Sequence, residues 1–263
     1  MGKLTIGFLG GCIHNQSGIS RTDLYYSVLA DLLSSVINKS ELQISLGRYH
    51  SFDQLVRQSQ NFINEKNPDL LFLFIRPFPL MPLHKPIIKY DKVNGKTSRA
   101  FHPGLLTRKP EWNKKLTANQ QTEPIQITKR NFFALRDLNL ALGILIGLHR
   151  WALKYLSLQI KHTRLLCERR NTELIIISPP QNPESLAGNI ICKLTSEYLS
   201  RYCRNNFIGF VNINSFTQTY FEKDNIHFNV AGHKKLAELL HSEIIASKSL
   251  HNNFNLINTF VKD

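Results

Sequence analysis

An aspartate and a histidine stand three residues apart near the end of the chain, as Asp224 and His227. With this spacing the carboxylate can orient the imidazole from one side while the other ring nitrogen faces a nucleophile. Gly232-His233 and an amphipathic helical pattern follow directly. A turn capped by Asp224, with His227 exposed, would give the same four-residue spacing. The longer pattern and its place before the final helix favour a catalytic pair.

A candidate nucleophile, Cys12, follows the first apolar strand after two glycines, Gly10 and Gly11. Glycines suit a sharp turn from a strand into a helix, and a thiol beside an imidazolium ionises below its usual pKa of about 8.5. The alternative is a small buried thiol at a tight turn. His14 and Asn15 are weaker candidates for local polar contacts. Three other cysteines lie in apolar helical patterns and are expected to be buried free thiols: Cys167, Cys192 and Cys203.

The elements that must position these residues alternate between strand and helix along the chain. Strands are predicted over residues 4–9, 42–46, 69–75, 173–178 and 207–213, and helices over about 20–37, 51–63, 132–170, 186–204 and 231–246. Ser20 with Asp23, and Ser51 with Gln54, fit capping boxes for the first two helices. The alternation predicts an α/β fold, a three-layer α/β/α sandwich with a central, mainly parallel five-stranded sheet. Ligands of such sheets bind beyond the carboxyl ends of the strands.

Residues 77–130 interrupt this pattern and are expected to form a basic, proline-rich insert or cap within a single domain spanning residues 1–263. Between residues 81 and 130 eleven Lys or Arg face three Asp or Glu, which supplies +8 of the net charge of +14. Such charge favours anionic partners, including an acidic carrier protein. Tyr90, Phe101 and Trp112 lie among the cations, but no nucleic-acid-binding motif accompanies them, so no specific nucleic acid is expected.

The order of these segments resembles the SGNH (GDSL-like) hydrolases. The run from Asp224 to His233 is similar to their block V, and Ile175–Pro180 is similar to the strand and prolines that precede it. Phe210-Val211-Asn212 resembles their fifth strand, although an Asp is usual where Asn212 stands. Gly47 occupies the place of the block II glycine, whose amide serves the oxyanion hole; a plain turn glycine is the alternative. The resemblance implies a catalytic triad that includes Asp224 and His227.

Two departures from the family pattern decide what chemistry is expected. Block I is Gly-Asp-Ser in the family, whereas Gly10-Gly11-Cys12 places a cysteine where the serine nucleophile stands. Block III is Gly-x-Asn-Asp in the family, and here Arg76 and the three residues after it lack the asparagine that binds the oxyanion. Arg76 could supply a compensating donor or bind an anionic substrate group, or could be an ordinary surface arginine. Gly11 and Gly47 would contribute backbone amides to the oxyanion hole.

The expected function is that of an acyl-processing enzyme, an esterase, thioesterase or acyltransferase that forms an acyl-enzyme on Cys12 with His227 and Asp224. No cofactor is expected, but a phosphopantetheine or CoA thioester is the favoured substrate form, because thiolates exchange readily with thioesters. The main alternative is a catalytically silent protein of the same fold that binds an anionic ligand or partner, as the missing asparagine would suggest. A plain carboxylesterase is a third possibility.

Composition bounds the remaining expectations. The hydrophobic fraction is 42% and the charged fraction 20%, as in ordinary globular proteins. Residues 1–6 lead straight into a strand without a signal-peptide pattern, so a cytoplasmic protein is expected. The apolar run Leu138–Leu148 is too short and too charged at its edges to span a bilayer; it suits the core, a homodimer face or an acyl channel. His227 and His233 have no third ligand at metal spacing, so no metal is expected.

Overall fold

Five parallel strands form the central sheet of the computed structural model, which describes residues 3–10, 14, 18–49, 54–75, 88–91, 96–99, 147–180, 186–222 and 227–247. Their order is β2-β1-β3-β6-β7, and every neighbouring pair is parallel. The strands are β1 (Leu4–Gly10), β2 (Leu42–Arg48), β3 (Leu70–Phe74), β6 (Glu173–Ile177) and β7 (Gly209–Val211). The predicted five-stranded parallel sheet is therefore confirmed.

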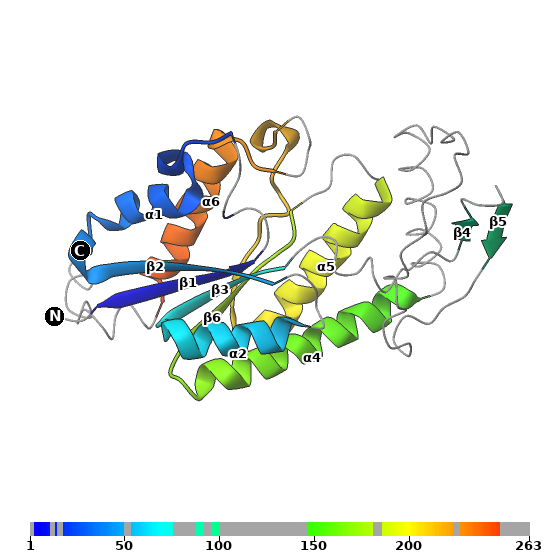
Figure 1. Cartoon of the computed structure of the whole chain (residues 1–263), viewed down its shortest axis with the longest axis horizontal. Helices are drawn as coiled ribbons and strands as arrows, with labels where there is room; N and C mark the ends of the chain where they lie inside the picture. Colours follow the sequence, from blue (N-terminus) through cyan, green and yellow to red (C-terminus); the bar gives the residue numbers. More distant parts are fainter. Residues whose placement is uncertain are drawn as a thin grey trace, which may run out of the picture.

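Helices cover both faces of this sheet and complete three layers (Figure 1). One face carries the pair α1 and α6, which pack against each other, and the other carries α2, α4 and α5. The helices are α1 (Tyr25–Leu33), α2 (Leu55–Lys66), α4 (Leu148–Glu168), α5 (Leu186–Asn205) and α6 (Val230–Ile245), with short 3-10 turns η2 (Arg21–Asp23), η3 (Lys39–Glu41) and η5 (Gln218–Tyr220). This is the predicted α/β/α sandwich.

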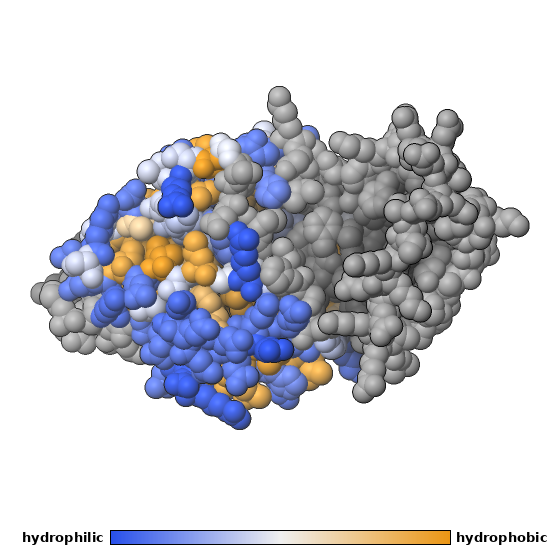
Figure 2. Space-filling model, in the orientation of Figure 1, coloured by the Kyte–Doolittle hydropathy of each residue, from blue (hydrophilic) through white to orange (hydrophobic). Residues whose placement is uncertain are grey.

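The central strand β3 shows why a continuous apolar run was needed. Side chains alternate across a strand, so Phe72 and Phe74 enter the core beneath α1 and α6, while Leu71 and Leu73 enter the core beneath α2 and α4. All five residues of β3 are buried. The edge strand β2 is less covered: Leu42, Ile44 and Leu46 are partly exposed, and Figure 2 shows apolar surface along this strand between hydrophilic helices.

Several predicted boundaries need correction. The helix predicted from residue 20 is broken, because Leu24 is buried in an extended conformation between η2 and α1. The Ser20 capping box is wrong, since the Ser20 hydroxyl bonds to the Thr22 hydroxyl and caps no backbone N–H. Gln54 is the N-cap of α2 without a side-chain cap, and Ser51 lies outside the described residues. The described part of the predicted 132–170 helix starts after Gly147, whose φ of 78° suits a glycine.

The described part of the basic insert, residues 88–91 and 96–99, is a pair of strands that was not predicted from the sequence. β4 (Ile88–Asp91) and β5 (Lys96–Arg99) pair in antiparallel fashion and form a separate two-stranded sheet. The rest of residues 77–130 lies outside the described residues, as does the apolar run 138–146. The division of the chain into one domain with an insert therefore stays a prediction.

Candidate functional site

The order of the strands identifies the edge of the sheet where a site is expected. β1 and β3 are neighbours, but the chain leaves β1 toward α1 on one face and leaves β3 toward α4 on the other. Ligands of open parallel sheets bind at such a switch point, outside the carboxyl ends of the strands. Cys12 comes two residues after the end of β1, and Arg76 comes two residues after the end of β3. Both residues lie outside the described ranges, but the strands that lead to them end at this switch point.

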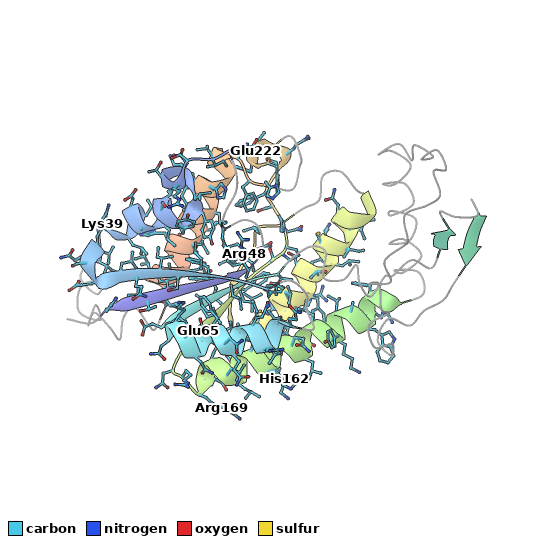
Figure 3. All side chains as sticks on the ribbon, in the orientation of Figure 1. Lys39, Arg48, Glu65, His162, Arg169 and Glu222 are labelled. Atoms are coloured by element: carbon cyan, nitrogen blue, oxygen red, sulfur yellow. The ribbon has the colours of Figure 1, made fainter. Side chains whose placement is uncertain are left out.

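Tyr49 fastens the three strand ends at this edge. Its backbone N–H donates to the Gly10 carbonyl at 3.1 Å, and its buried hydroxyl donates to the Phe74 carbonyl at 2.6 Å. One residue after β2 thus ties the ends of β1, β2 and β3 together. Arg48, directly before it, is exposed at the same edge of the sheet (Figure 3). Tyr49 was not predicted from the sequence, where its place immediately after a strand is the signal for it.

A buried group of rings lies between the end of β1 and the two helices above it. His14 and Tyr25 are hydrogen-bonded through Nδ1 and the hydroxyl at 2.6 Å, and the Tyr25 backbone N–H donates to His233 Nδ1 at 3.4 Å. The Tyr25 and His233 rings are nearly parallel, 7° apart in plane. All three side chains are at most 1% exposed. Gly10 makes room for this group, because a Cβ there would lie 3.1 Å from His14 Nε2.

The turn that carries His227 is held at both ends. The Glu222 N–H donates to the His227 carbonyl at 2.7 Å, and Phe221 and Phe228 form an antiparallel bridge. Glu222 lies on the same side of the sheet as α1 and α6 (Figure 3). Asp224 is inside this turn, among residues 223–226 that the structure does not describe. The predicted pairing of Asp224 with His227 therefore stays a prediction.

The first turn of α6 explains the Asn and Gly-His that follow His227. Asn229 caps the helix, since its Oδ1 accepts from the Gly232 N–H at 2.9 Å and its Nδ2 donates to the Thr219 carbonyl at 2.8 Å. Gly232 is required by space: a Cβ there would lie 2.2 Å from the Tyr220 carbonyl oxygen. These contacts hold the start of α6 against η5. They therefore also fix the backbone two residues after His227.

The two histidines of this turn have different environments. Burial, followed by the charge of His227, lowers the pKa of His233 to about 4. His233 is therefore neutral near pH 7, and its Nδ1 accepts the Tyr25 N–H. His227 is partly exposed and lies close enough to influence His233 electrostatically.

Gly47 lies within β2, opposite Leu9, rather than after the strand. A Cβ on Gly47 would lie 2.5 Å from the Phe62 ring, and one on Gly7 would lie 2.6 Å from the same ring. The two glycines thus let Phe62 of α2 pack directly on the strands. This packing accounts for a glycine at position 47 on structural grounds; the proposed role of its amide in an oxyanion hole stays a prediction.

Three of the four thiols are buried, as predicted. Cys167, Cys192 and Cys203 are free, and burial raises the pKa of each to about 12. Such thiols are inert near neutral pH. Cys12, Gly11, Asp224 and Arg76 lie outside the described residues, so the structure brings together only the elements that carry them. The predicted Cys12–His227–Asp224 triad is therefore untested by these contacts.

Within the described ranges, no group of three or more His, Cys, Asp or Glu residues could hold a metal ion. Across the same part of the chain, no helix combines the length and the apolar character needed to cross a bilayer.

No protein-family model matches the chain, and a comparison with curated proteins finds no match. Solved structures do match it. A protein assigned to the lipolytic G-D-S-L family of Desulfitobacterium hafniense has a TM-score of 0.53 and 10% identity, over 92% of this chain and 99% of that one. A family 3 carbohydrate esterase of Clostridium thermocellum has a TM-score of 0.54 and 16% identity, over 93% and 96%.

An acetylxylan esterase of Geobacillus stearothermophilus, Axe2, has a TM-score of 0.54 and 12% identity, over 93% of this chain and 95% of that one. Alanine variants of that esterase at a serine, an aspartate and a histidine are described as catalytic mutants, and the aspartate precedes the histidine by three positions. The matches cover nearly the whole of each chain and extend over the parallel sheet and its helices. The chain therefore has the fold of the SGNH (GDSL-like) hydrolases.

Proposed function

We propose that the protein is an acyl-processing enzyme that cleaves or transfers an acyl group through a covalent intermediate on Cys12. The observation that supports this most is the chain of buried contacts from His14 through Tyr25 to His233. His14 follows Cys12 by two residues, and His233, in the first turn of α6, follows His227 by six residues. The contacts thus draw the loop after β1 and the loop before α6 toward the same edge of the sheet.

In the proposed reaction, the Cys12 thiolate attacks the acyl carbonyl, and His227 takes the thiol proton and returns it to the leaving group. Asp224 orients His227 and stabilises its charged form. Backbone amides of Gly11 and Gly47 would donate to the oxyanion, with the Arg76 side chain supplying the donor that the family takes from asparagine. The acceptor in the second step is water, a hydroxyl or an amine.

The spacing of the proposed acid and base has a parallel in the similar structures. The aspartate and the histidine whose replacement gives catalytic mutants of the Geobacillus esterase are three positions apart, as Asp224 and His227 are. The similar structures are those of esterases and of a protein assigned to a lipolytic family. The proposal therefore covers hydrolysis of acyl esters in general. The cysteine at position 12 favours thioesters as the substrate.

A thioester substrate would be delivered on coenzyme A or on the phosphopantetheine arm of an acidic carrier protein. Both are anionic, and the net charge of +14 favours encounter with either. The phosphopantetheine thioester is a substrate in this proposal, and no resident cofactor takes part.

The test is intact-mass spectrometry of the protein after incubation with acyl-CoA thioesters of different chain lengths. Wild-type protein is expected to gain the mass of one acyl group, which maps to Cys12. Cys12→Ala should gain none, and His227→Ala should gain it at least a hundredfold more slowly. Cys167→Ala is the matched control, because it removes a buried thiol and should leave the adduct unchanged.

A second candidate function has its own supporting observation. Arg76-Pro77-Phe78-Pro79 stands where the SGNH hydrolases carry Gly-x-Asn-Asp, which is the change expected in a silent protein that binds an anionic partner. Absence of both adduct and turnover, with thioesters and with nitrophenyl esters, would favour this function. Turnover of short nitrophenyl esters without any thioester adduct would indicate a plain carboxylesterase.

A further inference from the structure

A polar groove of about 550 Å³ runs between α5 and the segment that follows β7. Its α5 bank is one stripe of the helix, because the lining positions recur at intervals of three and four residues. The stripe includes Lys193, Ser196, Arg201 and Arg204. The opposite bank includes Asn214, just beyond the end of β7.

The residues that line the groove carry more positive than negative charge. Lys193, Arg201 and Arg204 line it against one carboxylate, Glu197. None of these three cations forms an ion pair with another residue in the part of the chain that the structure describes. Exposed cations on one helix face usually serve only solubility, so the charge by itself does not identify a site.

Two buried polar atoms give independent support for a ligand. Ser196 is 4% exposed, and its hydroxyl has no hydrogen-bond partner within the described residues. The Asn214 Nδ2 group is also buried and without a partner there. Buried donors are nearly always satisfied in folded proteins, so an unsatisfied one calls for a partner such as an ion, a water or a ligand atom. Both residues line this groove.

The Asn214 side of the groove is held by a small network. The Asn214 backbone N–H donates to Asn212 Oδ1 at 3.0 Å, and the buried Ser178 hydroxyl donates to the same oxygen at 3.2 Å. The Ile213 N–H in turn donates to the Ser178 hydroxyl at 2.8 Å. These bonds fix the backbone around Asn214, so its unsatisfied amide is pre-positioned for a ligand atom.

We propose that this groove binds a phosphate group carried by a small-molecule ligand. Three cations, one hydroxyl and one amide all donate, and a phosphate monoester offers three terminal oxygens and two negative charges to receive them. The groove lies at β7, three strand positions from β1, which is about 14 Å at the usual spacing of strands. The inference is therefore separate from the proposed acyl chemistry and does not depend on it.

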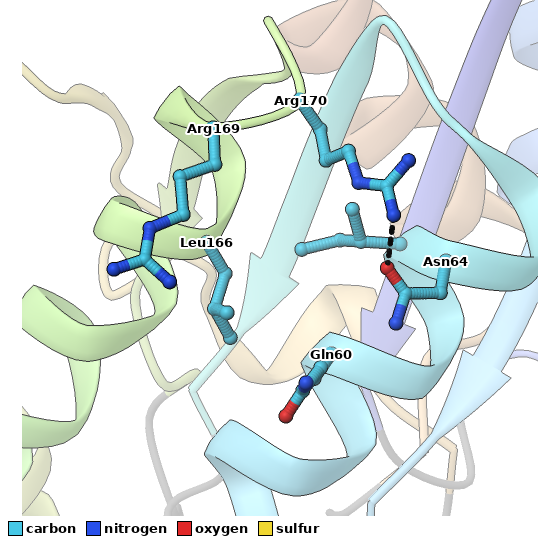
Figure 4. A pocket seen from close by; sticks show the side chains of 6 residues that line it. Gln60, Asn64, Leu166, Arg169 and Arg170 are labelled. Atoms are coloured by element: carbon cyan, nitrogen blue, oxygen red, sulfur yellow. Dashed lines mark hydrogen bonds between the residues drawn. The ribbon is translucent and has the colours of Figure 1, made fainter.

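A second basic hollow, between the carboxyl ends of α2 and α4, provides the contrast (Figure 4). Arg169 and Arg170 line it, but Arg170 already donates to Asn64 Oδ1 at 3.0 Å. No buried polar atom that lacks a partner lines this hollow within the described residues. It thus offers charge without an unsatisfied donor, and Arg169 supplies a matched control for the groove.

The test is isothermal titration of the full chain with inorganic phosphate and with coenzyme A, at fixed moderate salt. We expect saturable binding that Arg201→Gln weakens at least tenfold and Ser196→Ala at least threefold, with Arg169→Gln unchanged. Coenzyme A binding that is tighter than phosphate binding, and that Arg201→Gln weakens to the same extent, would identify a phosphorylated cofactor as the source of the group. Tighter coenzyme A binding that Arg201→Gln leaves unchanged would place coenzyme A at another site and overturn a small-molecule carrier for this groove. Loss of affinity in Arg169→Gln equal to that in Arg201→Gln, or no binding to wild type, would overturn the proposal.

Thermal melting without ligand separates a binding role from a structural one. Ser196→Ala removes an unsatisfied buried hydroxyl, so the ligand-free variant should melt no lower than wild type while binding phosphate more weakly. A large drop in its melting temperature would show that the hydroxyl supports the fold, and would contradict the assignment. Adduct formation on Cys12 in Arg201→Gln serves as the readout of the acyl chemistry, which this substitution should leave unchanged.

Discussion

Replacing His233 by asparagine removes the buried imidazole that joins α6 to α1. The asparagine amide oxygen can replace Nδ1 as the acceptor for the Tyr25 N–H, which now lies 3.4 Å from the ring nitrogen. Asparagine does not titrate, so the variant keeps a polar contact and loses only the protonation equilibrium. The expected consequence is a protein whose stability depends less on pH.

The magnitude follows from the shift in pKa. Burial lowers the pKa of His233 from 6.5 to about 4, so the unfolded chain binds a proton on this residue between those values and the folded chain does not. Stability is then lost as the pH falls through this window. Between pH 7.5 and pH 5 the loss from this one group is about 2 kcal/mol. His233→Asn should therefore lose about 2 kcal/mol less than wild type over the same interval.

The assay is urea unfolding followed by circular dichroism at pH 7.5 and pH 5. His162→Asn, at an exposed position on α4, is the control and should behave as wild type (Figure 3). NMR titration of the His233 ring measures the same equilibrium directly and remains informative if the variant is unstable. An equal loss of stability in wild type and His233→Asn, or a His233 ring that titrates near pH 6.5, would refute the reasoning.

Three further outcomes are expected. Gly232→Ala places a methyl group against the Tyr220 carbonyl, and should lower the free energy of unfolding by about 1–3 kcal/mol in urea titrations and slow any reaction that depends on His227. Tyr25→Phe removes the hydroxyl bonded to His14 and should cost about 1–3 kcal/mol by the same assay, because the buried imidazole loses this hydrogen bond. Iodoacetamide at pH 8 should modify one thiol of the folded protein, Cys12, as counted by intact mass, because the other three have pKa values of about 12.

Matched variants make these outcomes specific. Ala231→Ser changes an exposed neighbour of Gly232 and should leave stability within about 0.5 kcal/mol of wild type. Tyr26→Phe serves the same purpose for Tyr25. If Gly232→Ala is as stable as wild type, η5 can move away from the new methyl group at little cost. If Tyr25→Phe is as stable as wild type, other hydrogen bonds of His14 compensate for the lost one. Alkylation that persists in Cys12→Ala would show that a buried thiol is accessible.

The alternation of strands and helices was predictable because the apolar residues of each strand indicate that the strand is buried. β3 is the clearest case, since a strand covered on both faces must be apolar at every position. The Gly-His pair before α6 was also informative, because Gly232 has no room for a side chain. Local sequence was sufficient at positions where packing allows only one kind of residue, such as an apolar residue in β3 or a glycine at position 232.

The contacts that hold the site together could not be predicted in this way. Tyr25 and His233 are 208 residues apart, and Tyr49 reaches a carbonyl 25 residues away, so no local pattern links the partners. The capping box at Ser20 failed for a related reason: burial of Leu24 in an extended conformation interrupts the helix that the box would have started. Tertiary packing overrode a local preference worth about 1 kcal/mol.

The packing of α6 against α1 also sets an order of events during synthesis. A chain is made from its amino terminus toward its carboxyl terminus, so β1, α1, β2, α2 and β3 are made long before α6, which starts at Val230. Until then the apolar face of α1, with Leu29 and Leu33, lacks the helix that buries it. The nascent protein must therefore carry this uncovered face until α6 has been made. The step that finally covers it also brings His233 to Tyr25, so a chain cut short before residue 230 would lack the cover and the histidine pair together.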